Sequence, residues 1–319
     1  MRCIGSRLMH AFFYNASSPS AAEDDENNIA LHTTKWEQQQ QFQIPFRVAI
    51  SVFLLITNTL NIIGIKATNK YLTIPRKLFV LSSVIGIMVG AVSPINSCIG
   101  LFTKHCLNEV LTDSILVFLL SADFAILLII NLVRFFTLKA PLRRLNRVLV
   151  GGMLAGGIII SIVFGTLFFY LYHGATHPSH YYRMHWFCLG VFTSFCMICC
   201  LILMIMLWYM LRKRIKYFPQ NSTLFVKRHQ RSVKRLISIN LLYICFNVPM
   251  SKMCFHLVNI TGDVATQNQL SDELLIFSAF YSLCLIYSGV SCIVYMCWDA
   301  KILVLYKNIL CKMRTVPNV

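Results

Sequence analysis

Residues 110–133 have the sequence VLTDSILVFLLSADFAILLIINLV, in which Asp113 and Asp123 are the only charged side chains. A helix that crosses a lipid bilayer needs about 20 consecutive, mostly apolar residues. A helix also satisfies its own backbone hydrogen bonds, which is required in lipid because no water is available there. Residues 110–133 therefore predict one membrane-spanning helix.

Six further stretches have the same character, so the sequence predicts seven spans in total. They are residues 44–66, 78–102, 148–172, 187–211, 236–258 and 274–298. The strict alternation of apolar and polar residues that would indicate a membrane barrel is absent from the sequence. Of all residues, 57% are hydrophobic and 13% are charged, whereas a typical soluble domain has about 45–50% and about 25%. We therefore expect an all-α membrane protein, a seven-transmembrane helix bundle over residues 44–298.

The two ends of the chain lie outside this predicted bundle. Residues 1–43 are polar and rich in Ser, Glu and Gln, and we expect them to form a disordered tail. Residues 299–319 begin with apolar side chains set against cations, which predicts a short amphipathic eighth helix on the membrane surface, followed by a tail. Cys311, near the end of that helix, is a candidate palmitoylation site; the alternative is a solvated tail with a free thiol.

The distribution of charge predicts the orientation of the chain. Most of the 29 Lys and Arg residues follow the odd-numbered spans, in residues 66–77, 134–147, 212–235 and 301–314. The positive-inside rule places these segments in the cytoplasm, and therefore the N-terminus outside and the C-terminus inside the cell. Nucleic-acid binding is then not needed to explain the net charge of +17. Asn15 and Asn259 begin glycosylation sequons on the predicted outer side.

The junction after the third span, residues 133–144, has the sequence VRFFTLKAPLRR. It resembles the rhodopsin-like G-protein-coupled receptors, whose third helix ends in an acid-Arg-aromatic triplet followed by Pro-Leu-Arg. Arg134, Phe135 and Pro141 match that pattern, whereas Val133 replaces the acid. The resemblance implies that Arg134 meets a G protein in the active state; the alternative is an ordinary cytoplasmic Arg at a helix end. Without the acid, we expect Arg134 to be held less tightly in the resting state and signalling without ligand to be raised.

Two other spans carry partial matches to the same family. Tyr295 occupies the Tyr position of the family's Asn-Pro-x-x-Tyr motif, with Ser291 and Cys292 in place of Asn and Pro. Pro249 occupies the kink position of the sixth helix, where a proline removes one backbone hydrogen bond. Asn247 stands where the family usually has Trp. The resemblance covers about residues 45–312 and implies activation roles for Tyr295 and Pro249.

Asp123 is an ionisable residue near the middle of the third predicted span, where an unpaired carboxylate is costly. Gly86 stands where the family keeps a sodium-binding Asp. The resemblance therefore suggests that Asp123 serves a polar core with Ser291, and that a sodium ion could bind near it. The alternative is a protonated Asp123 that is hydrogen-bonded within the bundle and binds no ion. No other cofactor or metal is expected.

The family has a disulfide between its third helix and its second outer loop, and the resemblance implies a Cys106–Cys188 bond, with Cys98 as a competing partner. Oxidising conditions outside the cell permit such a bond. The loop before Cys188 contains four His residues. They could sense protons, recognise a ligand or have no role, and the sequence leaves these alternatives open.

The function expected from this resemblance is that of a G-protein-coupled receptor in the plasma membrane, which transduces binding of an extracellular peptide or small molecule. A heterotrimeric G protein is the expected cytoplasmic partner, with arrestin as a candidate second partner. Residues 212–235 carry nine cations and are the expected surface for such a partner or for anionic lipid. No protease motif is present in the sequence, and we expect no enzyme activity. The alternatives are a seven-helix transporter or ligand-gated channel, and a receptor-like protein that does not signal.

Overall fold

The protein is described by a computed structural model. It describes the backbone of residues 22–68, 73–102, 106–139, 147–173, 178–217, 223–260 and 267–314. Side chains are described for residues 44–68, 73–95, 111–112, 114–139, 148–167, 169–170, 186–213, 230–259 and 276–309.

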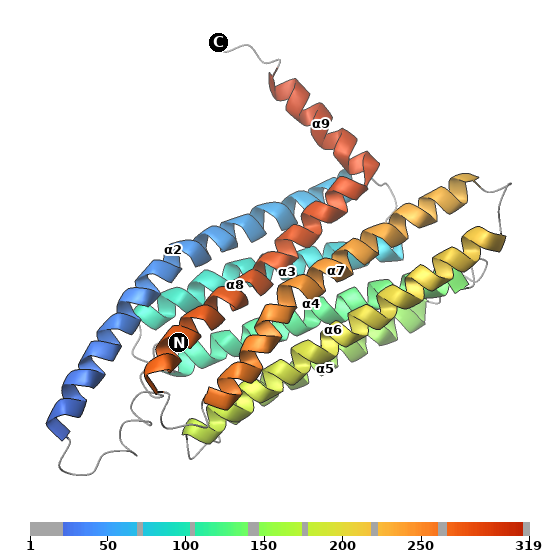
Figure 1. The fold of residues 1–319 in the computed structure, drawn as a ribbon. Coiled ribbons are helices and arrows are strands. Elements are labelled where there is room, and N and C mark those ends of the chain that lie inside the picture. The colour runs from blue at the N-terminus through green and yellow to red at the C-terminus, as the bar shows by residue number, and fades with distance from the viewer. Residues whose placement is uncertain are drawn as a thin grey trace.

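Seven long helices and one shorter helix make up the described part of the chain, which contains no strand (Figure 1). The long helices are α2 (Ala22–Thr68), α3 (Ile74–Phe102), α4 (Cys106–Lys139), α5 (Arg147–His173), α6 (Pro178–Tyr217), α7 (Thr223–Ile260) and α8 (Gln267–Trp298). The shorter helix α9 (Ala300–Arg314) follows α8 and turns away from the bundle. Each long helix contains a segment that is long and apolar enough to cross a membrane. These helices confirm the predicted seven-transmembrane bundle with a short eighth helix.

The predicted spans overlap all seven observed ones, and one of the larger shifts is at the start of the sixth. That span begins at Gln230 rather than at residue 236. Its first turns are amphipathic, because Val233 and Leu236 are buried whereas Arg231 and Lys234 are exposed. A search for purely apolar residues therefore finds its start too late.

The structure differs from the expectation of a disordered tail over residues 22–43. These residues are helical and continue into the first span as a single helix, α2. Glu and Gln, which together make up eight of these residues, have high intrinsic helix propensity, and the acidic residues 23–26 lie where the helix dipole favours negative charge. Residues 1–21, including Asn15, lie outside the described part of the chain.

The long helices form a bundle in which α4 occupies the central position. Helices α2, α3, α4 and α5 pack in chain order, as do α6, α7 and α8, and α2 packs against α8. Helix α4 contacts α3, α5 and α6, and 61% of its most apolar stretch is buried, compared with 17% of that of α5. The helix that carries Asp123 and Arg134 is therefore the most buried of the seven described spans.

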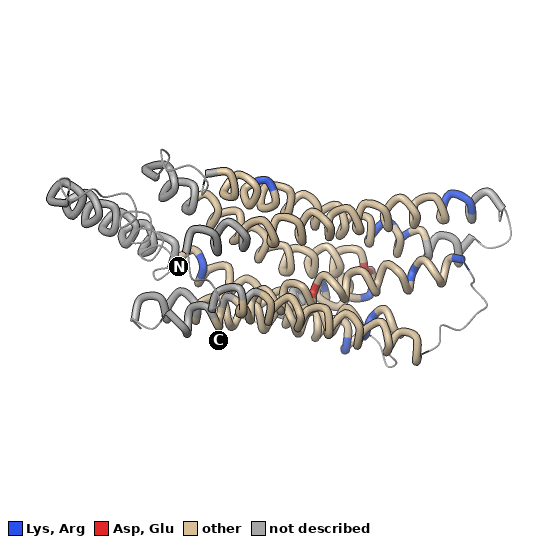
Figure 2. Tube along the Cα trace, turned by 90° about the horizontal axis from the view of Figure 1, so that it is seen from below, with Lys and Arg blue, Asp and Glu red and all other residues tan. Residues whose placement is uncertain are grey.

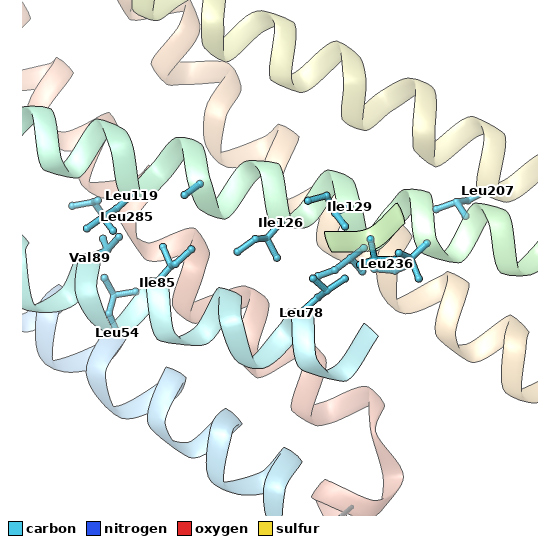
Figure 3. Close-up of a cluster of buried hydrophobic side chains, with 14 of the residues drawn as sticks. Leu54, Leu78, Ile85, Val89, Leu119, Ile126, Ile129, Leu207, Leu236 and Leu285 are labelled. Carbon is cyan, nitrogen blue, oxygen red and sulfur yellow. The ribbon is translucent and has the colours of Figure 1, made fainter. Parts of the chain in front are cut away.

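Large aliphatic side chains fill the space between the helices (Figure 3). The labelled members of this cluster are Leu54, Leu78, Ile85, Val89, Leu119, Ile126, Ile129, Leu207, Leu236 and Leu285. Outward-facing residues such as Ile159 and Ile160 are equally apolar but exposed. In lipid these outer residues lose nothing by exposure, so the helices are held together by close packing and by polar contacts between helices. The polar contacts between helices therefore indicate how the helices of this bundle are held relative to one another.

Most of the described Lys and Arg side chains lie toward one end of the bundle, which we call the basic end (Figure 2). It contains Lys66, Arg76, Lys77, Arg134, Lys139, Arg212, Lys213, Arg231, Lys234, Arg235 and Lys301. These residues lie at the ends of α2, α4 and α6 and at the starts of α3, α7 and α9. The basic end is thus formed where the chain leaves its odd-numbered spans, as the charge pattern predicts.

Helix α9 is anchored to α2 by a small residue and a tyrosine. A Cβ atom at Gly64 would lie 2.8 Å from Cγ2 of Ile302, so a larger residue would push α9 away. The hydroxyl of Tyr306 donates a hydrogen bond to the backbone oxygen of Leu60. Burial raises the pKa of Tyr306, which keeps the phenol protonated as a donor. These contacts fix α9 beside the basic end.

Candidate functional site

Asp123 lies in the middle of α4 and has one polar partner on α3. The hydroxyl of Ser82 donates a hydrogen bond of 2.5 Å to Oδ1 of Asp123, which is only 9% exposed. Ser291, the predicted partner, donates instead to the backbone oxygen of Ser288 at 2.8 Å. A serine in a helix can satisfy its hydroxyl on the carbonyl one turn back, and Ser291 does so. The side chain that bonds to Asp123 is thus Ser82, and a polar core shared by Asp123 and Ser291 stays a prediction.

A neutral network joins α2, α3 and α8 next to this carboxylate. Nδ2 of Asn61 donates to Oγ of Ser83 at 2.9 Å, and Sγ of Cys292 donates to Oδ1 of Asn58 at 3.0 Å. A Cβ atom at Gly86 would lie 2.5 Å from Oδ1 of Asn58, so the glycine makes room for that amide. The region around Gly86 thus contains a neutral Asn–Ser–Cys network.

The predicted sodium ion would have oxygen ligands available in this region. They are the carboxylate of Asp123 and the hydroxyl of Ser82, which are hydrogen-bonded to each other. Hard cations prefer such oxygen ligands. Among the described residues, no group of three or more His, Cys, Asp or Glu side chains could hold a metal ion. The sodium site stays a prediction.

An aromatic cluster lies beside the polar network and joins α4, α7 and α8. The ring centroid of Tyr243 lies 5.3 Å from that of Phe124 and 5.2 Å from that of Tyr287. Asn247, at the position of the family's Trp, donates to the backbone oxygen of Tyr243 at 2.8 Å and so satisfies itself within α7. Tyr243, one turn earlier, is therefore the α7 side chain that makes the aromatic contacts with α4 and α8.

Pro249 lies inside α7, where it leaves the carbonyl of Cys245 without its usual backbone donor. Contacts with neighbouring helices lie on both sides of this point. Sγ of Cys284 donates to the backbone oxygen of Phe246 at 3.4 Å, and the hydroxyls of Ser194 and Ser251 lie 2.6 Å apart. Pro249 is thus a point where α7 lacks one backbone hydrogen bond and is contacted by α6 and α8 on either side.

Two buried asparagines tie α7 to α4 near the basic end. Nδ2 of Asn131 donates to Oδ1 of Asn240 at 3.0 Å, and Nδ2 of Asn240 donates back to Oδ1 of Asn131 at 2.9 Å. Both side chains are fully buried. We call this pair the asparagine clasp. It lies one turn before Arg134, and sequence reasoning missed it although two polar residues in apolar spans were a usable signal.

A charged cluster ties the start of α7 to the end of α8. Nη2 of Arg76 lies 3.1 Å from Oδ2 of Asp299, and Nη1 of Arg235 lies 3.9 Å from the same oxygen. Arg235 also donates to the backbone oxygen of Trp298 at 3.1 Å, and its Cζ lies 4.5 Å from the ring centroid of Tyr295. Sequence reasoning missed this cluster too, although Asp299 is an acid within an otherwise basic segment.

The predicted coupling residues lie around these two ties. Arg134 is half-buried near the end of α4, and Phe135 is half-buried against the main core. Tyr295 is buried, with its ring centroid 4.1 Å from that of Phe79 on α3. Pro141 lies outside the described residues. The structure thus brings Tyr295 and Arg235 together and places Arg134 one turn beyond the asparagine clasp.

The predicted outer sites are only partly covered by the described side chains. Cys188 is a free cysteine within α6, which begins at Pro178, so it lies in a helix rather than in a loop. The structure therefore lacks the predicted bond from Cys188 to Cys106. Asn259 is exposed in the last turn of α7, as a glycosylation site requires. The side chains of Cys106 and Cys311 lie outside those described.

Comparison with known proteins adds no family assignment. No protein-family model matches the chain, and no curated protein matches its sequence. The geometry described above therefore carries the functional inference: a multi-pass membrane protein in which α7 is tied to α4 and α8 by polar contacts near a basic end.

Proposed function

We propose that this protein is a G-protein-coupled receptor of the rhodopsin-like type, and not an enzyme. The supporting observation is how α7 is held at the basic end. A fully buried asparagine clasp ties it to α4, and a charged cluster around Asp299 ties it to α8. Such contacts can be broken and remade without unfolding the apolar core, since each neutral hydrogen bond contributes only about 0.5–1.5 kcal/mol.

In this proposal the basic end faces the cytoplasm and the N-terminus lies outside the plasma membrane, as the positive-inside rule expects. An extracellular peptide or small molecule binds toward the opposite end of the bundle. It acts by having a higher affinity for the arrangement in which the start of α7 has moved away from α4 and α8. Arg134, near the end of α4, then meets the heterotrimeric G protein, and arrestin is a second partner of the same surface.

The test is guanine-nucleotide exchange on purified G-protein heterotrimers by the full chain in lipid nanodiscs. Exchange is measured first without ligand, because the loss of the acid at Val133 predicts basal activity, and then across peptide and small-molecule libraries. We expect Arg134→Gln to lower exchange about tenfold, which corresponds to one lost charge-assisted hydrogen bond. Lys139→Gln, an exposed cation in the last turn of α4, is the matched control and is expected to retain exchange.

An electrical recording separates this proposal from its rival. The same chain is expressed in cells that lack functional G proteins and is exposed to the libraries under voltage clamp. A receptor gives no current there. A ligand-evoked current that survives the Arg134→Gln change would support a transporter or channel and contradict the receptor proposal.

A further inference from the structure

Asp299 lies between α8 and α9, and its two carboxylate oxygens have different partners. Oδ1 accepts a hydrogen bond of 3.2 Å from the backbone nitrogen of Lys301, which makes Asp299 the N-cap of α9. Oδ2 faces the two guanidinium groups of Arg76 and Arg235. Asp299 is 7% exposed. One oxygen therefore caps a helix, and the other is available to hold neighbouring helices.

Arg235 is the side chain by which α7 reaches this site. Its Nη2 atom donates to the backbone oxygen of Trp298, one of the last carbonyls of α8, where the helix dipole is negative. Its guanidinium lies over the ring of Tyr295. Arg235 thus binds a carbonyl, an aromatic face and a carboxylate, all presented by the end of α8.

Asp299 faces two arginines, so the contacts of Arg235 can be broken without leaving the carboxylate unpaired. Removing one partner from a buried ion pair is normally costly, because the other charge is left unpaired. Here Asp299 would keep Arg76 at 3.1 Å if Arg235 left, and Arg76 belongs to α3 rather than to α7. The side chain of Arg235 is 14% exposed and lies at the basic end, where a guanidinium can be solvated. Moving α7 away therefore strands no buried charge.

We infer that Arg235, Asp299, Tyr295 and the carbonyl of Trp298 form a latch, the Asp299 latch, that holds the start of α7 against the end of α8 at rest. Arg76 keeps Asp299 in place whether the latch is closed or open. The latch is a contact separate from Arg134, whose neighbour Val133 cannot pair with a cation. Its effect on signalling rests on the proposed function, whereas its effect on the position of α7 does not.

The test measures the position of α7 directly, in the full chain in nanodiscs. Spin labels are attached through a genetically encoded ketone amino acid at Lys234 and Val304, which are both exposed and avoid the 13 cysteines. Asp299→Asn removes the charge but keeps an N-cap residue of equal quality. Arg235→Gln removes the other partner, and Arg231→Gln removes an exposed cation one turn away as the matched control.

We expect Asp299→Asn and Arg235→Gln each to raise the ratio of long to short label distances about threefold to tenfold, given a charge-assisted contact that solvent partly screens. Arg235→Gln also removes the contacts with Trp298 and Tyr295, so it is expected to open the latch at least as far as Asp299→Asn. The double variant is expected to be no more open than Arg235→Gln alone, because the Asp299 contact is already lost there. Arg231→Gln is expected to leave the distances unchanged. Basal nucleotide exchange is expected to follow the open fraction.

Two outcomes separate the latch from the proposed function. If neither Asp299→Asn nor Arg235→Gln changes the distances relative to Arg231→Gln, the latch is overturned, whatever the signal does. If the distances respond as expected but no variant exchanges nucleotide on any heterotrimer, the latch stands and the receptor function fails.

Discussion

The polar network in the middle of the bundle and the ties at the basic end use similar residues for different purposes. The network of Asn58, Asn61, Ser83 and Cys292 is neutral, buried and confined to α2, α3 and α8. The ties at the basic end all involve α7, and one of them is charged and partly exposed. A buried neutral network strands unpaired polar groups if its helices separate, whereas the charged tie of Arg235 is partly exposed and can be exchanged for solvent. In the proposed mechanism α2, α3 and α8 therefore form the fixed frame, and the part of α7 at the basic end moves.

The largest expected effect is on the fixed frame. Gly86→Val would place new side-chain atoms on the amide of Asn58, and we expect it to destabilise the protein by about 2–3 kcal/mol. The measurement is thermal unfolding in detergent, followed by thiol exposure. Gly151→Val is the control, since nothing lies within 4 Å of a Cβ atom there. Equal unfolding midpoints for the two variants would contradict the proposed tight packing of Asn58.

The asparagine clasp gives the next effect and separates stability from movement. Asn240→Ala leaves Asn131 buried without its partner, and we expect a loss of about 1–3 kcal/mol in unfolding free energy together with more basal nucleotide exchange. The double change to Leu at both positions leaves no unpaired amide and is expected to recover most of that stability. A double variant as unstable as Asn240→Ala would show that the clasp is not the relevant contact.

The next two variants test which serine hydroxyl stabilises Asp123. Ser82→Ala removes the hydrogen bond to the carboxylate of Asp123, and we expect a loss of about 1 kcal/mol in unfolding free energy. Ser291→Ala removes only a bond to a backbone oxygen that already has a helical partner, so its unfolding midpoint should stay close to that of the unmodified protein. A larger effect at Ser291 than at Ser82 would contradict Ser82 as the main partner of Asp123.

The smallest effect concerns α9. Tyr306→Phe removes the hydroxyl that bonds to Leu60 but keeps the ring, and we expect hydrogen exchange of α9 to rise about threefold, as for a loss of about 0.5–1 kcal/mol. The seven spans should keep their protection. Unchanged exchange in α9 would mean that the Ile302 contact alone anchors it.

The sequence alone was sufficient to predict the seven spans and the short eighth helix. Length and apolarity predicted the spans, because lipid permits few other solutions, and the amphipathic pattern after residue 298 predicted α9. The absence of an acid at Val133 predicted that Arg134 is held less tightly in the resting state. The contacts that hold α7 could not be predicted, because Asn131 and Asn240 are 109 residues apart and Arg235 and Trp298 are 63 apart. Such pairs depend on how the helices face one another, which one sequence does not specify.

Position-specific expectations had mixed outcomes for a similar reason. The depth of Asp123 followed from counting residues, and its burial agrees. Its partner depended on rotation of α3 and α8, and Ser82 bonds to it. Residues 22–43 were expected to be disordered from polarity alone, although their Glu and Gln content favours the observed helix.

The measurement that tests the central claim most directly is the label distance between Lys234 and Val304 with and without a nucleotide-free G-protein heterotrimer. The account predicts that the heterotrimer binds and shifts the distance toward the long population, and that guanine nucleotide reverses the shift. A heterotrimer that binds without changing this distance, or one that does not bind even to Asp299→Asn, would contradict it.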